Sequence, residues 1–204
     1  ISGSSILGQD GNDTFSFGNA VLSSTINGGS GTELLSFGVV LSSALIDGGE
    51  NNDSIILSTA AAVTSSTFKG GDGDDSFSVL VAPATSTFSG DAGNDTLSFA
   101  TNLTSIAVYG GDGVDSLILS GTSLSNTTLD YGAGNESIIF TATQTWVSTT
   151  VAGGAGNDTI TLGANLAFSN SVVSGDAGSD LMAISTTMVS STVYAGDLED
   201  SLVF

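Results

Sequence analysis

The sequence repeats one short unit ten times, and this repeat constrains the fold more than any other feature. The unit joins a glycine-rich turn that closes with an acidic residue to a short alternating apolar stretch, as in residues 70–79. The closing acids, here called the marker acids, follow one another at spacings of 20 to 22 residues. They are Asp13, Glu33, Asp53, Asp75, Asp95, Asp115, Glu136, Asp158, Asp180 and Asp200. A repeat of this length along the whole chain predicts a solenoid with one coil per copy.

The residues after each marker acid alternate between apolar and polar. Phe77 and Val79 stand two and four positions after Asp75, and the equivalent positions are apolar in every copy. Such alternation predicts a strand with one face in the core. A second predicted strand precedes each glycine turn and ends seven residues before the next marker acid, at Ile26, Ile46, Phe68, Phe88, Val108, Leu129, Val151, Val173 and Val193.

We therefore predict an all-β fold in which residues 1–204 form a single parallel β-solenoid, or β-roll, of about ten coils. The two strands of each coil stack on their neighbours as two parallel sheets. All variation in repeat length falls between the strands, at the edge opposite the glycine turns, which indicates a geometric constraint at the turns alone. Because neither end carries a polar capping repeat, we expect a segment of a longer protein or a subunit that stacks end to end.

The charge of the chain excludes several classes of partner. One Lys, no Arg, no His and 21 acidic residues give a formal charge of −20, which would repel nucleic acid and anionic membrane surfaces. No run of about 18 apolar residues predicts insertion into a membrane. Cysteine is absent, so disulfides and thiolate metal sites are excluded.

The acidic residues are confined to the glycine turns. The ten windows of seven residues that end at the marker acids hold all 21 acids and 23 of the 28 glycines. Stacked turns of like charge would repel one another, so a bound cation is expected. Calcium fits, because it takes carboxylate and carbonyl oxygens in flexible geometry, whereas zinc and copper prefer His or Cys.

Three of the turns resemble a known calcium motif. Residues 70–77 (GGDGDDSF), 110–117 (GGDGVDSL) and 153–160 (GGAGNDTI) are similar to the G-G-x-G-x-D-x-U pattern of the RTX calcium-binding repeats. The resemblance implies a parallel β-roll with Ca²⁺ between successive turns, held by the ten marker carboxylates and by turn carbonyls. The implied carbonyl ligands in these three turns are those of Gly70, Asp72, Gly73, Gly110, Asp112, Gly113, Gly153, Ala155 and Gly156.

The chain departs from the family pattern in several ways. It has one glycine turn in each coil of about 21 residues, which by resemblance implies one row of calcium ions along one edge and a metal-free opposite edge. Two turns close with Glu33 and Glu136 instead of Asp. Asn51 replaces a glycine at little cost because Asn visits the left-handed region, whereas Leu198 at the last turn is a poor substitute. The second glycine is replaced at two further positions, Asp91 and Asp176.

An outward position of the second predicted strand suggests a different function. It is occupied by Thr25, Leu45, Thr67, Thr87, Ala107, Thr128, Thr150, Val172 and Thr192. A flat Thr array resembles those of ice-binding solenoids, although β-branched Thr also suits any exposed strand. The uncharged faces could equally pack against identical neighbours.

We expect no enzymatic activity, because the abundant Ser residues have no His, and no Lys except Lys69, to act as a base. The principal expectation is a calcium-binding structural module of an extracellular or cell-surface bacterial protein, as part of a surface layer, filament, stalk or adhesin. The alternatives are a calcium-dependent ice- or glycan-binding solenoid that uses the Thr array, and the non-catalytic domain of a larger secreted enzyme. The expected partners are calcium ions and other copies of the chain, bound laterally or end to end.

Overall fold

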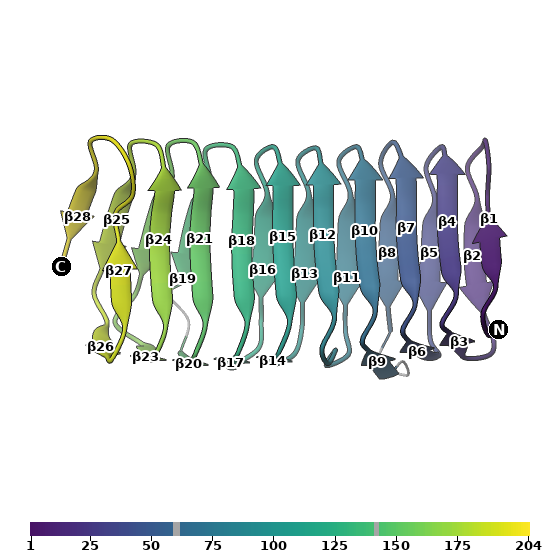
Figure 1. The fold of residues 1–204 in the computed structure, drawn as a ribbon, viewed down its shortest axis with the longest axis horizontal. Helices are drawn as coiled ribbons and strands as arrows, with labels where there is room; N and C mark the ends of the chain where they lie inside the picture. The colour runs from purple at the N-terminus through teal and green to yellow at the C-terminus, as the bar shows by residue number, and fades with distance from the viewer. Residues whose placement is uncertain (59–61, 141–142) are drawn as a thin grey trace.

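A computed structural model describes residues 1–58, 62–140 and 143–204. These residues contain strands and turns but no helix, and every paired strand runs parallel to its neighbour. The chain winds into a β-solenoid of about ten coils, with the glycine turns along one edge and short strands along the other (Figure 1). The predicted fold class is therefore confirmed.

The first sheet, here called the long sheet, contains one strand from every coil. The strands lie side by side in chain order, from the N-terminal coil to the C-terminal coil (Figure 1). They are β1 (Ser5–Leu7), β4 (Thr25–Ser30), β7 (Leu45–Glu50), β10 (Thr67–Asp72), β12 (Thr87–Ala92), β15 (Ala107–Asp112), β18 (Thr128–Ala133), β21 (Thr150–Ala155), β24 (Val172–Ala177) and β27 (Thr192–Tyr194).

The second sheet faces the long sheet across the core and is formed in two parts, one of six strands and one of four. Its strands follow the marker acids, as the sequence predicts. The six are β2 (Thr14–Phe17), β5 (Leu34–Phe37), β8 (Ser54–Leu57), β11 (Ser76–Val79), β13 (Thr96–Phe99) and β16 (Ser116–Leu119). The four are β19 (Ser137–Phe140), β22 (Thr159–Leu162), β25 (Leu181–Ile184) and β28 (Ser201–Val203).

Short strands form a third set at the edge opposite the glycine turns, here called the far edge. They are β3 (Val21–Leu22), β6 (Val40–Ser42), β9 (Ala62–Thr64), β14 (Leu103–Thr104), β17 (Ser123–Ser125), β20 (Gln144–Val147), β23 (Leu166–Ser169) and β26 (Thr187–Val189). The sequence predicts one strand where the structure has a far-edge strand followed by a strand of the long sheet.

A corner of left-handed residues separates these two strands. Ser23 has a φ of 48°, and a similar positive φ recurs at the corner of each later coil. Val21 and Ile26, on either side of the corner, are both fully buried although five residues apart. A continuous strand would place residues at an odd spacing on opposite faces, so both can be buried only if the chain turns between them.

The predicted end of the long strand also differs from the observed one. The prediction ends this strand at Ile26, whereas β4 continues through Gly28 and Gly29 to Ser30. These glycines lie within the sheet, where Gly29 pairs in register with Gly49 of the next coil. The turn itself is therefore shorter than the sequence suggests.

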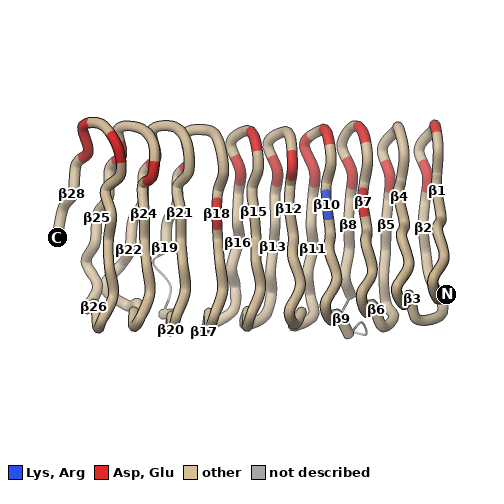
Figure 2. The backbone as a smooth tube through the Cα atoms, in the orientation of Figure 1, with Lys and Arg blue, Asp and Glu red and all other residues tan. Residues whose placement is uncertain are grey.

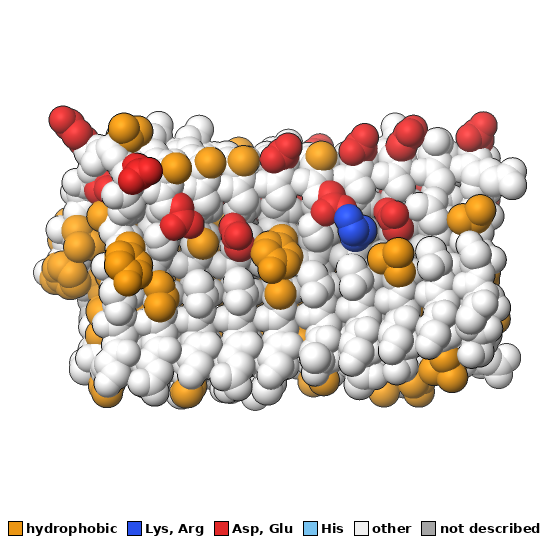
Figure 3. All heavy atoms as spheres, in the orientation of Figure 1, with side chains coloured by type: hydrophobic (Ala, Val, Ile, Leu, Met, Phe, Trp, Pro, Cys, Tyr) orange, Lys and Arg blue, Asp and Glu red, His pale blue; other side chains and the backbone are white. Residues whose placement is uncertain are grey.

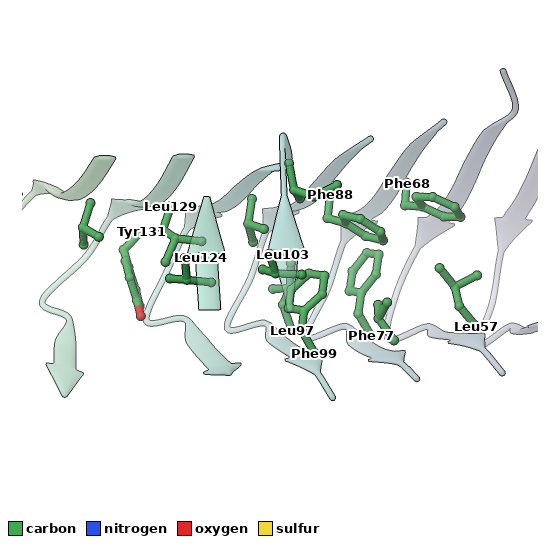
Figure 4. Close-up of a cluster of buried hydrophobic side chains, with 14 of the residues drawn as sticks. Leu57, Phe68, Phe77, Phe88, Leu97, Phe99, Leu103, Leu124, Leu129 and Tyr131 are labelled. Atoms are coloured by element: carbon green, nitrogen blue, oxygen red, sulfur yellow. The ribbon is translucent and has the colours of Figure 1, made fainter. Parts of the chain in front are cut away.

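Each coil adds one layer of side chains to the core. Phe77 pairs in register with Leu97, and Val79 with Phe99, so equivalent apolar residues stack along the roll. Phe68 stacks on Phe88 with ring centroids 4.7 Å apart (Figure 4). One coil alone could not bury this apolar surface, so each coil depends on its neighbours. The stacking of the core residues also fixes the register of the turns.

Candidate metal centre

The marker acids lie in a line along the turn edge of the solenoid, here called the marker row (Figure 2). Each follows a turn and precedes a strand of the second sheet, so the stacking of the sheets places successive marker acids one coil apart. The eight marker acids from Glu33 to Asp180 have exposed fractions of only 1–6%. Asp13 and Asp200, in the terminal coils, are partly exposed.

A ladder of hydrogen bonds connects the marker row along the roll. The backbone N–H of Asp75 donates to Oδ1 of Asp95 at 2.7 Å, and the N–H of Asp95 donates to Oδ1 of Asp115 at the same distance. Seven of the nine steps have this bond: Glu33 to Asp53, Asp53 to Asp75, Asp75 to Asp95, Asp95 to Asp115, Glu136 to Asp158, Asp158 to Asp180 and Asp180 to Asp200. One oxygen of each accepting carboxylate is thus oriented by the preceding coil.

The other carboxylate oxygens are buried without a partner. Within the described part of the chain, eleven side-chain oxygens are both buried and without a hydrogen bond, and all belong to marker acids. They are Oδ2 of Asp13, Asp53, Asp75, Asp95, Asp115, Asp158 and Asp180, and both Oε atoms of Glu33 and Glu136. A buried carboxylate oxygen without a donor or counter-charge is strongly unfavourable, so this row requires protons or bound cations.

Backbone carbonyls lie beside these oxygens because glycine leaves space for them. A Cβ added to Gly70 would clash with Oδ2 of Asp75 and would lie 2.5 Å from the carbonyl oxygen of Gly90 in the next coil. Gly90 and Gly110 have the same surroundings, with the carboxylate of their own coil and the carbonyl of the next. Each such position brings carboxylate and carbonyl oxygens together, which is the donor set that calcium takes.

The raised pKa values of the marker acids also indicate that their buried charge is unfavourable. Burial is the main cause that raises the pKa of Asp75 to about 7, and the charges of Asp95 and Asp53 raise it further, while the N–H from Asp53 acts in the opposite direction. Burial likewise raises the pKa of Asp95 to about 6. Burial and the neighbouring Asp158 raise the pKa of Glu136. The row therefore carries negative charge at neutral pH only at a cost in free energy.

The predicted carbonyl ligands have different neighbours. Those of Gly70 and Gly110 lie against the glycines of the preceding coil, and those of Gly73, Gly113 and Gly156 against the glycines of the following coil. The carbonyls of Asp112 and Ala155 each accept a backbone N–H at 2.8 Å, from Gly93 and Gly134. Asp72 is the last residue of β10, as Ala155 is of β21, and Gly153 stands in β21 where Gly70 stands in β10.

Side chains alone do not complete a metal site. In residues 1–58, 62–140 and 143–204, no group of three or more His, Cys, Asp or Glu side chains is arranged to hold a metal. A cation in the marker row would therefore depend on main-chain carbonyls in addition to marker carboxylates, as the resemblance implies. The residues fit calcium in their chemistry.

The substitutions in the turns adopt the backbone that glycine would adopt. Asn51, Asp91 and Asp176 have φ values of 73°, 74° and 70°. Leu198 has a φ of 80° and an exposed fraction of 80%, so the last turn combines backbone strain with an exposed apolar side chain. The expected weakness of Leu198 at this position is consistent with this geometry.

Lys69 lies outside the marker row, on the outer face of the long sheet. Its Nζ lies 3.1 Å from Oδ2 of Asp91, and this is the single salt bridge of the described residues (Figure 3). Ser89 Oγ donates to the same carboxylate at 2.5 Å. The one basic side chain of the protein therefore neutralises a surface carboxylate and not a buried marker acid.

The far edge contains a polar ladder that the sequence analysis missed. The N–H of Ser66 donates to Oγ of Ser86 at 3.1 Å, and this Oγ donates to the carbonyl of Ala84 at 3.0 Å. Ser171 and Ser191 repeat the first bond. The available signal was the Ser or Thr that stands just before eight of the ten long-sheet strands, and its role is to satisfy buried backbone groups at the corner.

The outward Thr positions stand in register as the sequence suggests. Thr67 pairs with Thr87, and Thr128 with Thr150, while Leu45, Ala107 and Val172 interrupt the array. The lower half of this face, toward the far edge, shows no charged side chain in the view of Figure 3. A shallow hollow lies at Ala107, lined by Thr87, Thr128 and corner residues.

Comparison with known proteins adds no family assignment. The sequence matches no protein-family model. A search of curated proteins gives no match either. Among the described residues, no helix is long and apolar enough to cross a membrane.

Proposed function

We propose that this chain is a calcium-binding structural module of a secreted or cell-surface protein, in which Ca²⁺ ions between successive turns hold the solenoid together. The observation that carries the proposal is the marker row, with its eleven buried carboxylate oxygens that have no hydrogen-bond partner among the described residues. Each marker carboxylate would bind calcium through the oxygen that the ladder leaves unpaired. The glycine carbonyls beside it would supply further ligands.

The charge balance supports a divalent cation. Ten turns have nine gaps between them, and nine Ca²⁺ ions would add a charge of about +18 to the formal charge of −20. Protons can also neutralise the buried carboxylates, but with a pKa raised to about 7 a group such as Asp75 is only partly protonated at neutral pH. At the neutral pH of most extracellular fluids, calcium is the better counter-charge.

Calcium would couple folding to the environment of the protein. Millimolar calcium outside the cell would load sites that are too weak for cytosolic concentrations, so the chain would fold after export. A rigid rod of stacked coils suits a stalk, a surface layer, a filament or an adhesin. In a larger secreted enzyme the same rod would act as a non-catalytic domain.

Contacts between copies belong to this proposal. The outward residues of the second sheet are Ser, Thr and apolar side chains, and Ile118 and Ile139 are 47% and 59% exposed. No charge on these positions opposes lateral approach of an identical face. Sedimentation velocity in calcium buffer over a range of protein concentrations tests self-association.

Circular dichroism and calcium binding together test the principal proposal. The protein is measured in about 2 mM calcium, in the same concentration of magnesium and after treatment with EGTA. We expect strand content and several bound ions in calcium, and loss of both in EGTA and in magnesium. A chain that binds no calcium and keeps its strand content in EGTA would contradict the proposal.

The Thr array favours a second candidate, which is binding of ice or a glycan. The supporting observation is the in-register stacking of Thr side chains on an uncharged part of the long sheet. Measurement of thermal hysteresis and a glycan array, both in calcium buffer, test this function. If neither activity is found and folding still depends on calcium, the structural role is the candidate that remains.

A further inference from the structure

The second sheet is interrupted at one step, between the sixth and seventh coils. β16 pairs with β13 and β19 pairs with β22, but the described residues contain no pairing between β16 and β19. Every other step of this sheet is paired. The long sheet continues across the same step, where Val108 pairs with Leu129. We call this step the seam, formed by residues 116–119 on one side and 137–140 on the other.

Burial changes at the seam. Leu97 and Phe99 in β13 are fully buried. Leu117 and Leu119, at the equivalent positions of β16, are only partly buried. The unpaired edge of β16 therefore exposes apolar side chains that every interior coil of the first part covers, which reduces the hydrophobic contribution of this one interface.

The marker row loses its hydrogen bonds at the same step, although the N–H of Gly113 still donates to the carbonyl of Ala133 at 2.7 Å. Asp115 and Glu136 lack the marker-row hydrogen bond within the described chain, although the steps on both sides have it. The N–H of the residue after each marker acid donates to the preceding marker carbonyl, as Ser116 does to Asp95 at 2.8 Å. Among the described residues Ser137 alone does not repeat this bond to the preceding coil.

Three substitutions coincide at this step. Tyr131, with an exposed fraction of 3%, replaces the glycine that leaves space for the marker carboxylate in eight of the other nine turns. Glu136 replaces Asp, and both of its buried Oε atoms have no partner within the described residues. Val114 stands where the preceding turn has Asn94, whose Oδ1 accepts the N–H of Val114 at 2.8 Å. A Val side chain has no oxygen that could accept the equivalent N–H of the next turn.

Glutamate alone does not open the sheet. Glu33 also receives no marker-row bond from the preceding coil in the described structure, and both of its Oε atoms lack partners. Yet β2 and β5 are paired at that step, and the N–H of Leu34 donates to the carbonyl of Asp13 at 2.9 Å. The step from Asp13 to Glu33 contains no counterpart of Tyr131 or Val114, because Gly28 and Asn12 occupy their positions.

We propose that the seam divides the marker row into two blocks, residues 1–119 and 128–204, that load calcium and fold as separate cooperative units. This inference rests on the calcium binding proposed above. In a solenoid, cooperativity passes through the interfaces between neighbouring repeats. The seam is the one step at which the described residues show no pairing in the second sheet. The continuous long sheet keeps the two blocks attached to each other.

The blocks differ in length, which makes them separable by experiment. The first has six turns with five gaps between them, and the second has four turns with three gaps. A longer array of coupled repeats loads and folds more cooperatively than a shorter one. We therefore expect the first block to fold at a lower calcium concentration than the second.

Hydrogen exchange of the full chain across a calcium titration tests the inference directly. Protection is read for residues 76–79 and 96–99 in the first block and for residues 159–162 and 181–184 in the second. We expect two midpoints that differ by about fivefold or more in calcium concentration. A single midpoint for all four segments, with calcium bound, would overturn the two blocks and leave the proposed function intact. No calcium uptake would overturn both.

A variant that restores the common residues at the seam tests the cause. The triple substitution Val114→Asn, Tyr131→Gly and Glu136→Asp should move the two midpoints together into one transition. Glu33→Asp is the matched control, because it makes the same acidic exchange at a paired step and should leave two midpoints. Midpoints that stay apart in the triple variant would overturn the assignment to these residues. If that variant does not fold, the wild-type titration still decides the inference.

Discussion

The backbone N–H of Asp75 donates to Oδ1 of Asp95 at 2.7 Å, while Oδ2 of Asp95 is buried with no hydrogen-bond partner in the described structure. The two oxygens of one carboxylate therefore have different roles. The first connects neighbouring coils by a charge-assisted hydrogen bond, and the second remains available to a cation. This relationship recurs along the marker row.

Asp95→Asn removes the charge of this side chain and keeps its shape. The amide oxygen can still accept the N–H of Asp75, but the buried negative charge is lost. We expect the variant to bind fewer calcium ions than the wild type and to be more stable by about 1–3 kcal/mol without calcium at pH 8, since burial of the charge is no longer required.

Equilibrium dialysis and urea unfolding measure the two effects. Asp74→Asn is the matched control, because Asp74 is exposed and its Oδ1 accepts the N–H of Asn94 in the same manner. The control should keep the wild-type number of ions. Equal loss of calcium in both variants would show that the buried carboxylate has no special role.

Gly70→Ala should destabilise the protein by about 1–3 kcal/mol, because the added methyl would occupy the space of Oδ2 of Asp75 and of the Gly90 carbonyl. It should also weaken calcium binding. Gly18→Ala is the control: Gly18 has no atom within 4 Å of an added Cβ among the described residues, so its free energy of unfolding should change little. Thermal unfolding in calcium compares them, and equal melting temperatures would contradict the packing around Gly70.

The metal-free protein should become less stable as the pH rises from about 4 to about 7. Burial raises the pKa of Asp75 to about 7 and of Asp95 to about 6, so the folded chain holds protons that the unfolded chain, with ordinary carboxyl pKa values, has released. The folded state binds more protons in this range, and its free energy of unfolding therefore falls with rising pH.

Urea unfolding in buffers freed of metal by a chelating resin measures this pH dependence. Added calcium should weaken or reverse the trend, because calcium binds the deprotonated carboxylates and its affinity increases with pH. Stability of the metal-free chain that rises between pH 4 and 7 would argue against buried, unpaired marker carboxylates.

Ser86→Ala should cost about 1–3 kcal/mol of stability without changing calcium stoichiometry. The substitution leaves the buried N–H of Ser66 without its acceptor. It also removes one of two bonds to the carbonyl of Ala84, which still accepts the N–H of Ser65. Ser78→Ala, on the outward face of β11, is the control and should change stability by less than about 0.5 kcal/mol. Equal effects of the two substitutions would show that the corner hydroxyls do not stabilise the far edge.

Much of the fold is encoded in short-range patterns that repeat. The regular return of acid-closed turns and the alternation after residues such as Asp75 predict parallel coils, and the structure confirms these. The corner at Ser23 was missed, although the odd spacing of Val21 and Ile26 contains the signal. Odd spacing is informative only once both residues are known to be buried.

The candidate site was predictable in its residues but not in its connections. The confinement of acids to the turns identifies the marker acids. The sequence could not show that one oxygen of Asp95 would be held by Asp75, because that bond depends on the exact register of two coils. The seam was not predicted either, because Val114, Tyr131 and Glu136 look like isolated departures from the repeat until the structure places them at one interface.

A direct count of bound calcium tests the central proposal most sharply. The wild-type chain, dialysed against millimolar calcium at pH 7.5 and analysed by native mass spectrometry and metal analysis, should hold several ions and approach nine, one for each gap between turns. EGTA should remove them together with the strand signal in circular dichroism. A chain that stays folded with at most one bound calcium would contradict the account.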